Sequence, residues 1–77
     1  METQFHTLKS LFDQLGLDSS NKAIDDFIEA NRPLPKHITL SKAPFWNESQ
    51  ASFIEQGVAD DADWAEVIDH LDAQLRH

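Results

Sequence analysis

The sequence predicts an all-α protein of about four short helices, two before and two after a central extended segment that contains proline. Three observations lead to this prediction. Apolar side chains recur at helical spacing in both halves of the chain, capping residues precede these runs, and all three prolines stand between Arg32 and Trp46. Because proline fixes φ, lacks an N–H group and disfavours α geometry in the preceding residue, the middle segment is not expected to be helical.

The first helix is predicted over residues 8–15. Thr7 is a good N-cap residue, and Gly16 supplies the C′ position at which many helices end. Its apolar residues fall on one helical face: Leu8, Leu11, Phe12 and Leu15.

The second helix is predicted over residues 20–31, with Asp18 or Ser19 as its N-cap. Arg32-Pro33 ends it, because the residue before a proline avoids the α region. Its apolar face holds Ala23, Ile24, Phe27 and Ile28, and its outer face holds Lys22, Asp25, Asp26 and Glu29.

The third helix is predicted over residues 48–58. Asn47 and Gln50 have the spacing of a capping box, in which two side chains satisfy backbone N–H groups reciprocally. Gly57 weakens the helix, so it indicates either a close contact between helices or an early end. The apolar members are Ala51, Phe53, Ile54 and Val58.

The fourth helix is predicted over residues 61–75. Acids from Asp60 to Asp63 are typical of a first helical turn, where the macrodipole favours negative charge. Asp72 and Arg76 are expected to pair at i, i+4. An apolar stripe follows the helical period: Trp64, Val67, Ile68, Leu71 and Leu75.

Residues 32–46 form the segment that we call the strap. Leu34, Ile38 and Leu40 alternate with polar residues, and we interpret the strap as an extended segment that lays these three side chains across the helices. The alternative is a short strand that pairs with its copy in a homodimer, since a lone strand has no ladder partner within one chain.

Size and composition exclude several classes of protein. The 77 residues correspond to a single small domain over 1–77, and the absence of cysteine excludes disulfides and thiolate metal sites. The N-terminus lacks the features of a signal peptide, and no apolar run approaches the roughly 20 residues of a membrane span, so we expect a cytoplasmic protein.

The net charge of −8 is unevenly distributed. The flanking segments, residues 1–29 and 48–77, carry all 14 acids, whereas residues 30–47 carry three basic residues and no acid. A largely acidic surface repels phosphate backbones, so direct nucleic-acid binding is not expected.

No motif for catalysis or cofactor binding is present, and we expect neither enzymatic activity nor a cofactor. Asp60, Asp61, Asp63 and Glu66 lack the spacing of a calcium loop and are better explained as helix-start acids. Glu66 and His70 stand at i, i+4 and could supply two metal ligands, but a zinc site needs three or four. We therefore assign no metal site.

The strap also provides a candidate partner-binding surface, because aromatic and arginine residues are enriched at binding hot spots. The candidate residues are Arg32, Lys36, His37, Lys42, Phe45 and Trp46. The competing interpretation, which we favour for the aromatic pair, is that both rings attach the third helix to the core while the cations neutralise nearby acids.

Several strings of residues resemble a known family. They are His6-Thr-Leu8, Leu11-Phe12, Gln14-Leu-Gly-Leu17, Arg32-Pro-Leu-Pro35, Ala43-Pro-Phe-Trp46 and Asp61-Ala-Asp-Trp-Ala-Glu-Val67. In combination they resemble a family of short, acidic bacterial proteins classed as a domain of unknown function. The resemblance spans nearly the whole chain and implies a helical, cytoplasmic, single-domain protein; it implies no activity and no catalytic residues.

These observations predict a non-catalytic protein-interaction or regulatory module. It would bind an unknown protein partner, or a second copy in a homodimer, through the strap and the acidic face of the fourth helix. The alternative is a small-ligand or metal-binding protein that uses Glu66, His70 and nearby carboxylates.

Overall fold

The computed structural model describes residues 7–76, and within them the protein consists of four α-helices and one short 3-10 helix, without a strand. The α-helices are α1 (Leu8–Gln14), α2 (Asn21–Asn31), α3 (Glu48–Asp60) and α4 (Ala62–Leu75), and the 3-10 helix η1 spans Leu40–Lys42. The all-α prediction is confirmed. The ends of the predicted domain, together with His6, lie outside the described residues.

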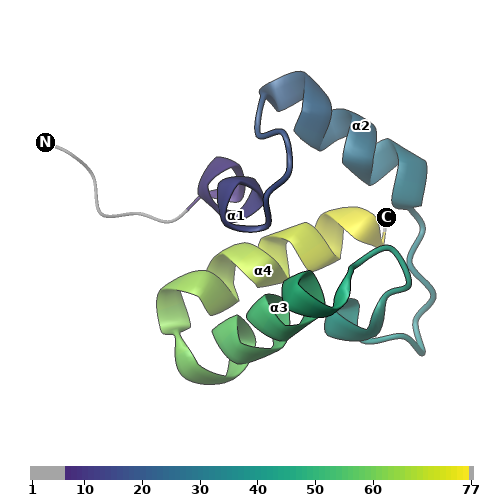
Figure 1. Cartoon of the computed structure of the whole chain (residues 1–77). Helices are drawn as coiled ribbons and strands as arrows, with labels where there is room; N and C mark the ends of the chain where they lie inside the picture. The colour runs from purple at the N-terminus through teal and green to yellow at the C-terminus, as the bar shows by residue number, and fades with distance from the viewer. Residues whose placement is uncertain (1–6, 77) are drawn as a thin grey trace, which may run out of the picture.

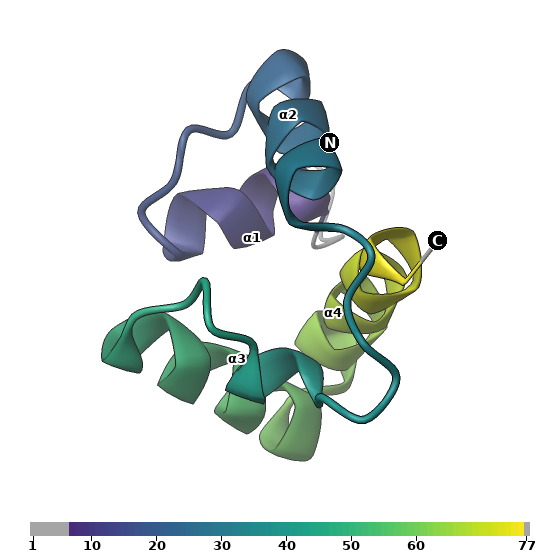
Figure 2. The same ribbon diagram turned by 90° about the vertical axis from the view of Figure 1, so that its right-hand side faces the viewer.

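The helices form two layers. Helices α3 and α4 run antiparallel as a hairpin, and α1 and α2 lie across one side of it (Figures 1 and 2). Both α1 and α2 contact α4 as well as each other, and η1 contacts α3. The strap leaves the end of α2, passes the C-terminal end of α4 and returns to the start of α3 (Figure 1).

One apolar core joins these elements. Every side chain of the core is at most 9% exposed, and no polar or charged residue among 7–76 is buried. The core residues are Leu11, Phe12, Leu15, Ile24, Ile28, Leu34, Leu40, Ala43, Trp46, Ile54, Val67, Ile68, Leu71 and Leu75. Four of these residues come from the strap: Leu34, Leu40, Ala43 and Trp46. The strap therefore buries apolar side chains in the core although most of it is not helical.

The caps of α1 are the predicted ones. The Thr7 hydroxyl accepts a hydrogen bond from the Ser10 N–H at 3.1 Å. Gly16 has φ of +73°, and the Leu17 N–H donates to the Phe12 carbonyl at 2.9 Å. This is the Schellman motif, which requires a left-handed residue after the helix.

The predicted N-cap of α2 is wrong. Ser20, rather than Asp18 or Ser19, caps the helix, because its hydroxyl accepts from the Ala23 N–H at 3.1 Å. Asp18 instead accepts from the Ser20 N–H at 3.0 Å and so shapes the turn before the helix. The helix ends at Asn31, and the following Arg32–Pro33 peptide bond is cis.

The start of α3 is confirmed and its predicted end is wrong. Asn47 and Gln50 form both hydrogen bonds of the capping box, at 2.8 and 2.9 Å. The helix continues two residues past the predicted end, to Asp60, because Gly57 serves the close contact and does not terminate it. A Cβ atom there would lie only 2.9 Å from Ile68 Cδ1. Val58, an apolar member of the predicted helix, is 54% exposed.

Helix α4 follows without a loop. Asp61 is both the C-cap of α3 and the N-cap of α4, and its carboxylate accepts from the N–H groups of Asp63 and Trp64. Asp61 and Asp63 therefore stand at a helix start, as predicted, whereas Asp60 is the last residue of α3. Trp64 is half-buried against the edge of Phe53, whereas the other residues of the stripe are buried. None of the helices between residues 7 and 76 is both long enough and apolar enough to cross a bilayer.

Candidate partner-binding surface

The strap is extended only in its first part, which differs from the prediction. Arg32 to Pro35 has no regular hydrogen bonding, the Ile38 N–H then donates to the Pro35 carbonyl, and η1 follows. The prolines explain the first part because they block helix formation there. Between Thr39 and Ala43 no proline intervenes, so the Ala43 N–H can donate to the Leu40 carbonyl at 3.0 Å and close the 3-10 turn.

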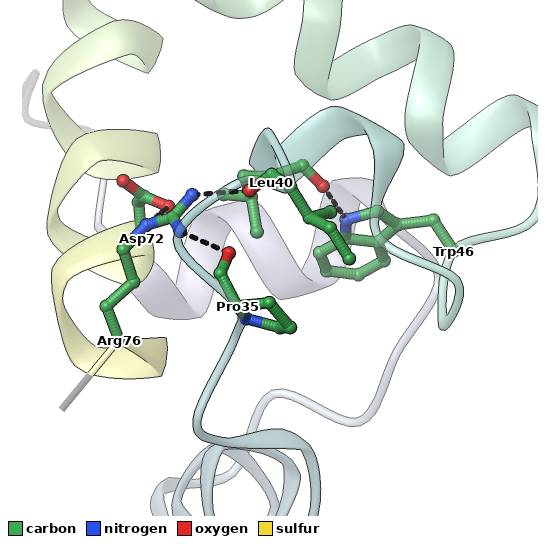
Figure 3. A network of polar contacts seen from close by, with 6 residues as sticks. Pro35, Leu40, Trp46, Asp72 and Arg76 are labelled. Carbon is green, nitrogen blue, oxygen red and sulfur yellow. Dashed lines mark hydrogen bonds and ion pairs between the residues drawn. The ribbon is translucent and has the colours of Figure 1, made fainter.

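Arg76 attaches the strap to the end of α4 (Figure 3). Its Nε donates to Asp72 at 2.9 Å, which confirms the predicted pair. Its two terminal nitrogens donate to the Pro35 carbonyl at 2.9 Å and to the Ile38 carbonyl at 2.8 Å. One planar guanidinium thus holds the turn of the strap in place, and its five fixed donors suit this task.

A backbone contact adds to this attachment. The Leu34 N–H donates to the Leu75 carbonyl at 2.7 Å, so the strap also satisfies one of the carbonyls left unpaired at the end of α4. Leu34 and Leu40 are buried, and Ile38 is half-buried against the core. The apolar residues of the strap therefore face the helices, as the alternation of the sequence indicates.

The aromatic pair at the end of the strap packs on the core: Trp46 belongs to it, and Phe45 is half-buried against it. Trp46 is 9% exposed, and its indole N–H donates to the Leu40 carbonyl at 2.9 Å (Figure 3). Its ring stacks on Phe27 with centroids 5.4 Å apart, and Phe45 meets both rings edge to face. Of the two interpretations of Phe45 and Trp46, these contacts support the one in which both rings pack against the core at the start of the third helix.

The four basic candidates lie on the outside. The side chains of Lys36, His37 and Lys42 are exposed and form no hydrogen bond or ion pair with another residue of 7–76. Arg32 is exposed as well but is paired with Glu29 at 2.6 Å. The strap thus keeps its aromatic residues inside and presents three uncommitted basic side chains to solvent.

Glu66 and His70, the residues of the alternative ligand site, line one hollow. It has a volume of about 330 Å3 and lies between the start of α1 and α4, with Thr7, Leu8 and Val67 as its other walls. No group of three or more His, Asp or Glu side chains within residues 7–76 is arranged to hold a metal ion. The pair therefore brings two donors into one open hollow and lacks a described third ligand.

Sequence reasoning missed the contacts of Arg76 and Gln50. Arg76 stands 38 and 41 residues from the carbonyls that it binds, and the Gln50 amide donates to the Leu15 carbonyl at 2.9 Å across 35 residues. Every residue has the same backbone carbonyl, so the residue types in a sequence do not show which carbonyl a side chain will bind. A cation at the end of a helix is expected to suit the last carbonyls of that helix, so this signal does not point to the strap.

The comparisons with known proteins agree with this fold. The family model described as "Protein of unknown function (DUF2789)" matches residues 1–75. The chain is also similar to the solution NMR structure of protein CV0237 from Chromobacterium violaceum, with 43% sequence identity and a TM-score of 0.79 over 99% of this chain and 95% of that one. No curated protein matches the chain. By the extent of the family match and by this identity, the chain belongs to the DUF2789 family of proteins of unknown function.

Proposed function

We propose that this protein is a non-catalytic interaction module and that the strap is its contact surface for an acidic segment of a protein partner. The observation that carries the proposal is the division of the strap into two sides. Its apolar and aromatic residues are fixed to the core, while Lys36, His37 and Lys42 are exposed and unpaired within the described chain.

The way the strap is attached supports this role. A partner that binds a segment already held in one conformation does not have to pay the ordering entropy of a flexible loop. Arg76 and the indole of Trp46 hold both ends of the turn region, from Pro35 to Leu40, through hydrogen bonds of 2.8 to 2.9 Å. The basic side chains are consequently presented from a pre-organised backbone.

The charge distribution supports the same role. No acid lies between residues 30 and 47, whereas all 14 acids of the chain flank this segment. Opposite potentials on two partners steer their encounter and suppress wrong partners. A local positive surface on an otherwise acidic molecule is therefore suited to select a partner by charge.

The test is affinity capture from a lysate of the source organism, after nuclease treatment, with mass spectrometry of the retained proteins. The variant Lys36→Glu/Lys42→Glu reverses two exposed charges that take part in no hydrogen bond of the fold. Arg32 is left unchanged because reversing it would place two carboxylates at the Glu29 pair. We expect this variant to lose a protein that the unmodified chain retains.

The matched control is Lys9→Glu/Ser52→Glu/Gln56→Glu, which changes the net charge by the same amount at exposed positions of α1 and α3 and breaks no ion pair. It should retain the same protein, with a melting temperature that confirms folding. Equal loss in both variants would show that only net charge matters, and equal retention would exclude the strap as the contact surface. Either result overturns the proposal.

A further inference from the structure

An apolar groove runs along α2 beside the turn that joins α1 to α2. It has a volume of about 410 Å3, within the range of about 300–1,000 Å3 typical of binding clefts. Phe12, Leu17 and Phe27 line it, together with the small side chains of Ala23 and Ala30. No candidate residue of the strap contributes to this groove, so it is a separate surface.

The groove is open because small side chains flank a phenylalanine on one face of α2. Ala23, Phe27 and Ala30 follow one another at i, i+4 and i+7, so they share a helical face. The two alanines are too small to cover the ring between them. Phe27 stacks on Trp46 and meets Phe12 edge to face at 5.3 Å, yet it remains half-buried and contributes to the groove.

Two carboxylates stand at the edge of the groove. Asp18 Oδ1 accepts a hydrogen bond from the Ser20 N–H, and Asp26 Oδ2 accepts one from the Lys22 ammonium at 3.0 Å. That contact raises the pKa of the Lys22 ammonium, first through the hydrogen bond and then through the charge of Asp26. The second oxygen of each carboxylate makes no hydrogen bond with a residue of 7–76, so each can accept one from a ligand.

The surface around the groove is also negatively charged. Between Thr7 and Asn31, the layer of α1 and α2 carries five acids and two lysines. An apolar floor with an acidic edge is complementary to an apolar side chain flanked by cations, and an amphipathic helix presents such a pattern at i, i+3 and i+4. A purely apolar ligand would leave the carboxylates unused, and an acidic one would be repelled by them.

We propose that this groove binds a basic amphipathic helix of a partner protein, with aliphatic side chains on Phe12, Leu17 and Phe27 and Lys or Arg side chains at Asp18 and Asp26. This surface differs from the strap in both position and sign of charge. The proposed function and this inference can therefore fail separately.

The test is an NMR titration of the 15N-labelled full chain with a synthetic 14-residue peptide of leucine and lysine. Its leucines are spaced at i, i+3 and i+4, and a second peptide replaces every lysine with glutamate. We expect the lysine peptide to shift the amide signals of residues 17–18, 23 and 26–31. The glutamate peptide should leave them in place.

Two variants make the assignment specific. Asp18→Asn/Asp26→Asn retains the acceptors used within the fold but removes both charges, and it should raise the Kd for the lysine peptide roughly tenfold, as expected for two exposed ion pairs. Asp13→Asn/Glu55→Gln changes the net charge equally at exposed positions outside the groove and should change the Kd less than about twofold. Ala30→Arg places a cation in the groove and should abolish binding.

Several results would overturn the proposal. They are equal weakening by both double variants, equal binding of the glutamate peptide, shifts outside the groove, or no binding of the lysine peptide. Sedimentation equilibrium of the protein alone measures whether it forms a dimer. A dimer that Ala30→Arg dissociates would assign the groove to a second copy of this chain instead of a basic partner.

Discussion

The side-chain amide of Gln50 makes two hydrogen bonds in different directions. Its oxygen accepts from the Asn47 N–H at 2.9 Å, and its nitrogen donates to the Leu15 carbonyl at 2.9 Å. The first bond completes the cap of α3, and the second connects that cap to the end of α1. A capping box accepts Gln or Glu at this position, so only the second bond explains a need for the amide.

We therefore predict that Gln50→Glu destabilises the protein by about 1–2 kcal/mol, the range expected for a polar group left without its partner. The carboxylate keeps the acceptor for Asn47 but cannot donate to Leu15 and repels its carbonyl. Urea unfolding at pH 7 measures the change. Gln56→Glu makes the same chemical change at an exposed position of α3 and should cost little. Equal stability of the Gln50 variant and the unmodified chain would contradict the contact to Leu15.

At the same scale, Gly57 shows what residue identity can and cannot predict. The sequence allowed either a close contact or the end of a helix, because glycine serves both. Ile68 Cδ1 and Trp64 Cβ, which would lie 2.9 and 3.3 Å from an added Cβ, decide in favour of the contact. Those neighbours come from α4, and the sequence of α3 contains no information about them.

At the scale of elements, local signals predicted the helices and missed the shape of the strap. The capping residues Thr7 and Asn47, the Gly16 stop and the apolar stripes act within a few residues, so they can be recognised in a sequence. The turn at Pro35 and the helix η1 depend on Arg76 and on burial of Leu40, which are contacts with distant residues. The packing of Phe45 and Trp46 likewise depends on Phe27 of α2, which is distant in the sequence.

Arg76 gives the corresponding prediction. Arg76→Lys keeps the charge near Asp72 but cannot bind two strap carbonyls as the planar guanidinium does, so we expect a loss of about 1–2 kcal/mol, reduced by partial exposure of the site. Amide exchange should also become faster at the Leu34 N–H, which depends on the docked strap. Urea unfolding and hydrogen exchange by NMR measure both effects.

Arg32→Lys is the matched control, because the Arg32 side chain is paired only with Glu29 among the described residues. It should change the free energy of unfolding by less than about 0.5 kcal/mol, as is usual for an exposed ion pair. Similar effects of the two substitutions, or unchanged exchange at Leu34 in the Arg76 variant, would show that the strap is held by apolar burial alone.

At the scale of the whole molecule, the two proposed surfaces carry opposite charge. The strap presents Lys36, His37 and Lys42, and the groove along α2 has Asp18 and Asp26 at its edge. The sequence shows the charge separation directly, since residues 30–47 contain no acid. The groove could not be predicted, because it depends on how Phe12 and Leu17 meet α2 in three dimensions. A small protein with two such surfaces is suited to connect two partners.

The absence of cysteine allows the central claim to be tested by site-specific photocross-linking. A benzophenone maleimide is attached to the variant His37→Cys on the strap, and to Ser52→Cys on the exposed face of α3 as the control. Both are irradiated in a lysate of the source organism. If the strap is the contact surface for a protein partner, the His37 variant yields one discrete adduct that Ser52→Cys does not form. Adding an excess of the unlabelled Lys36→Glu/Lys42→Glu variant to the lysate should not reduce this adduct, because that variant does not bind the partner. No adduct from His37→Cys, or the same adducts from both positions, would contradict the account.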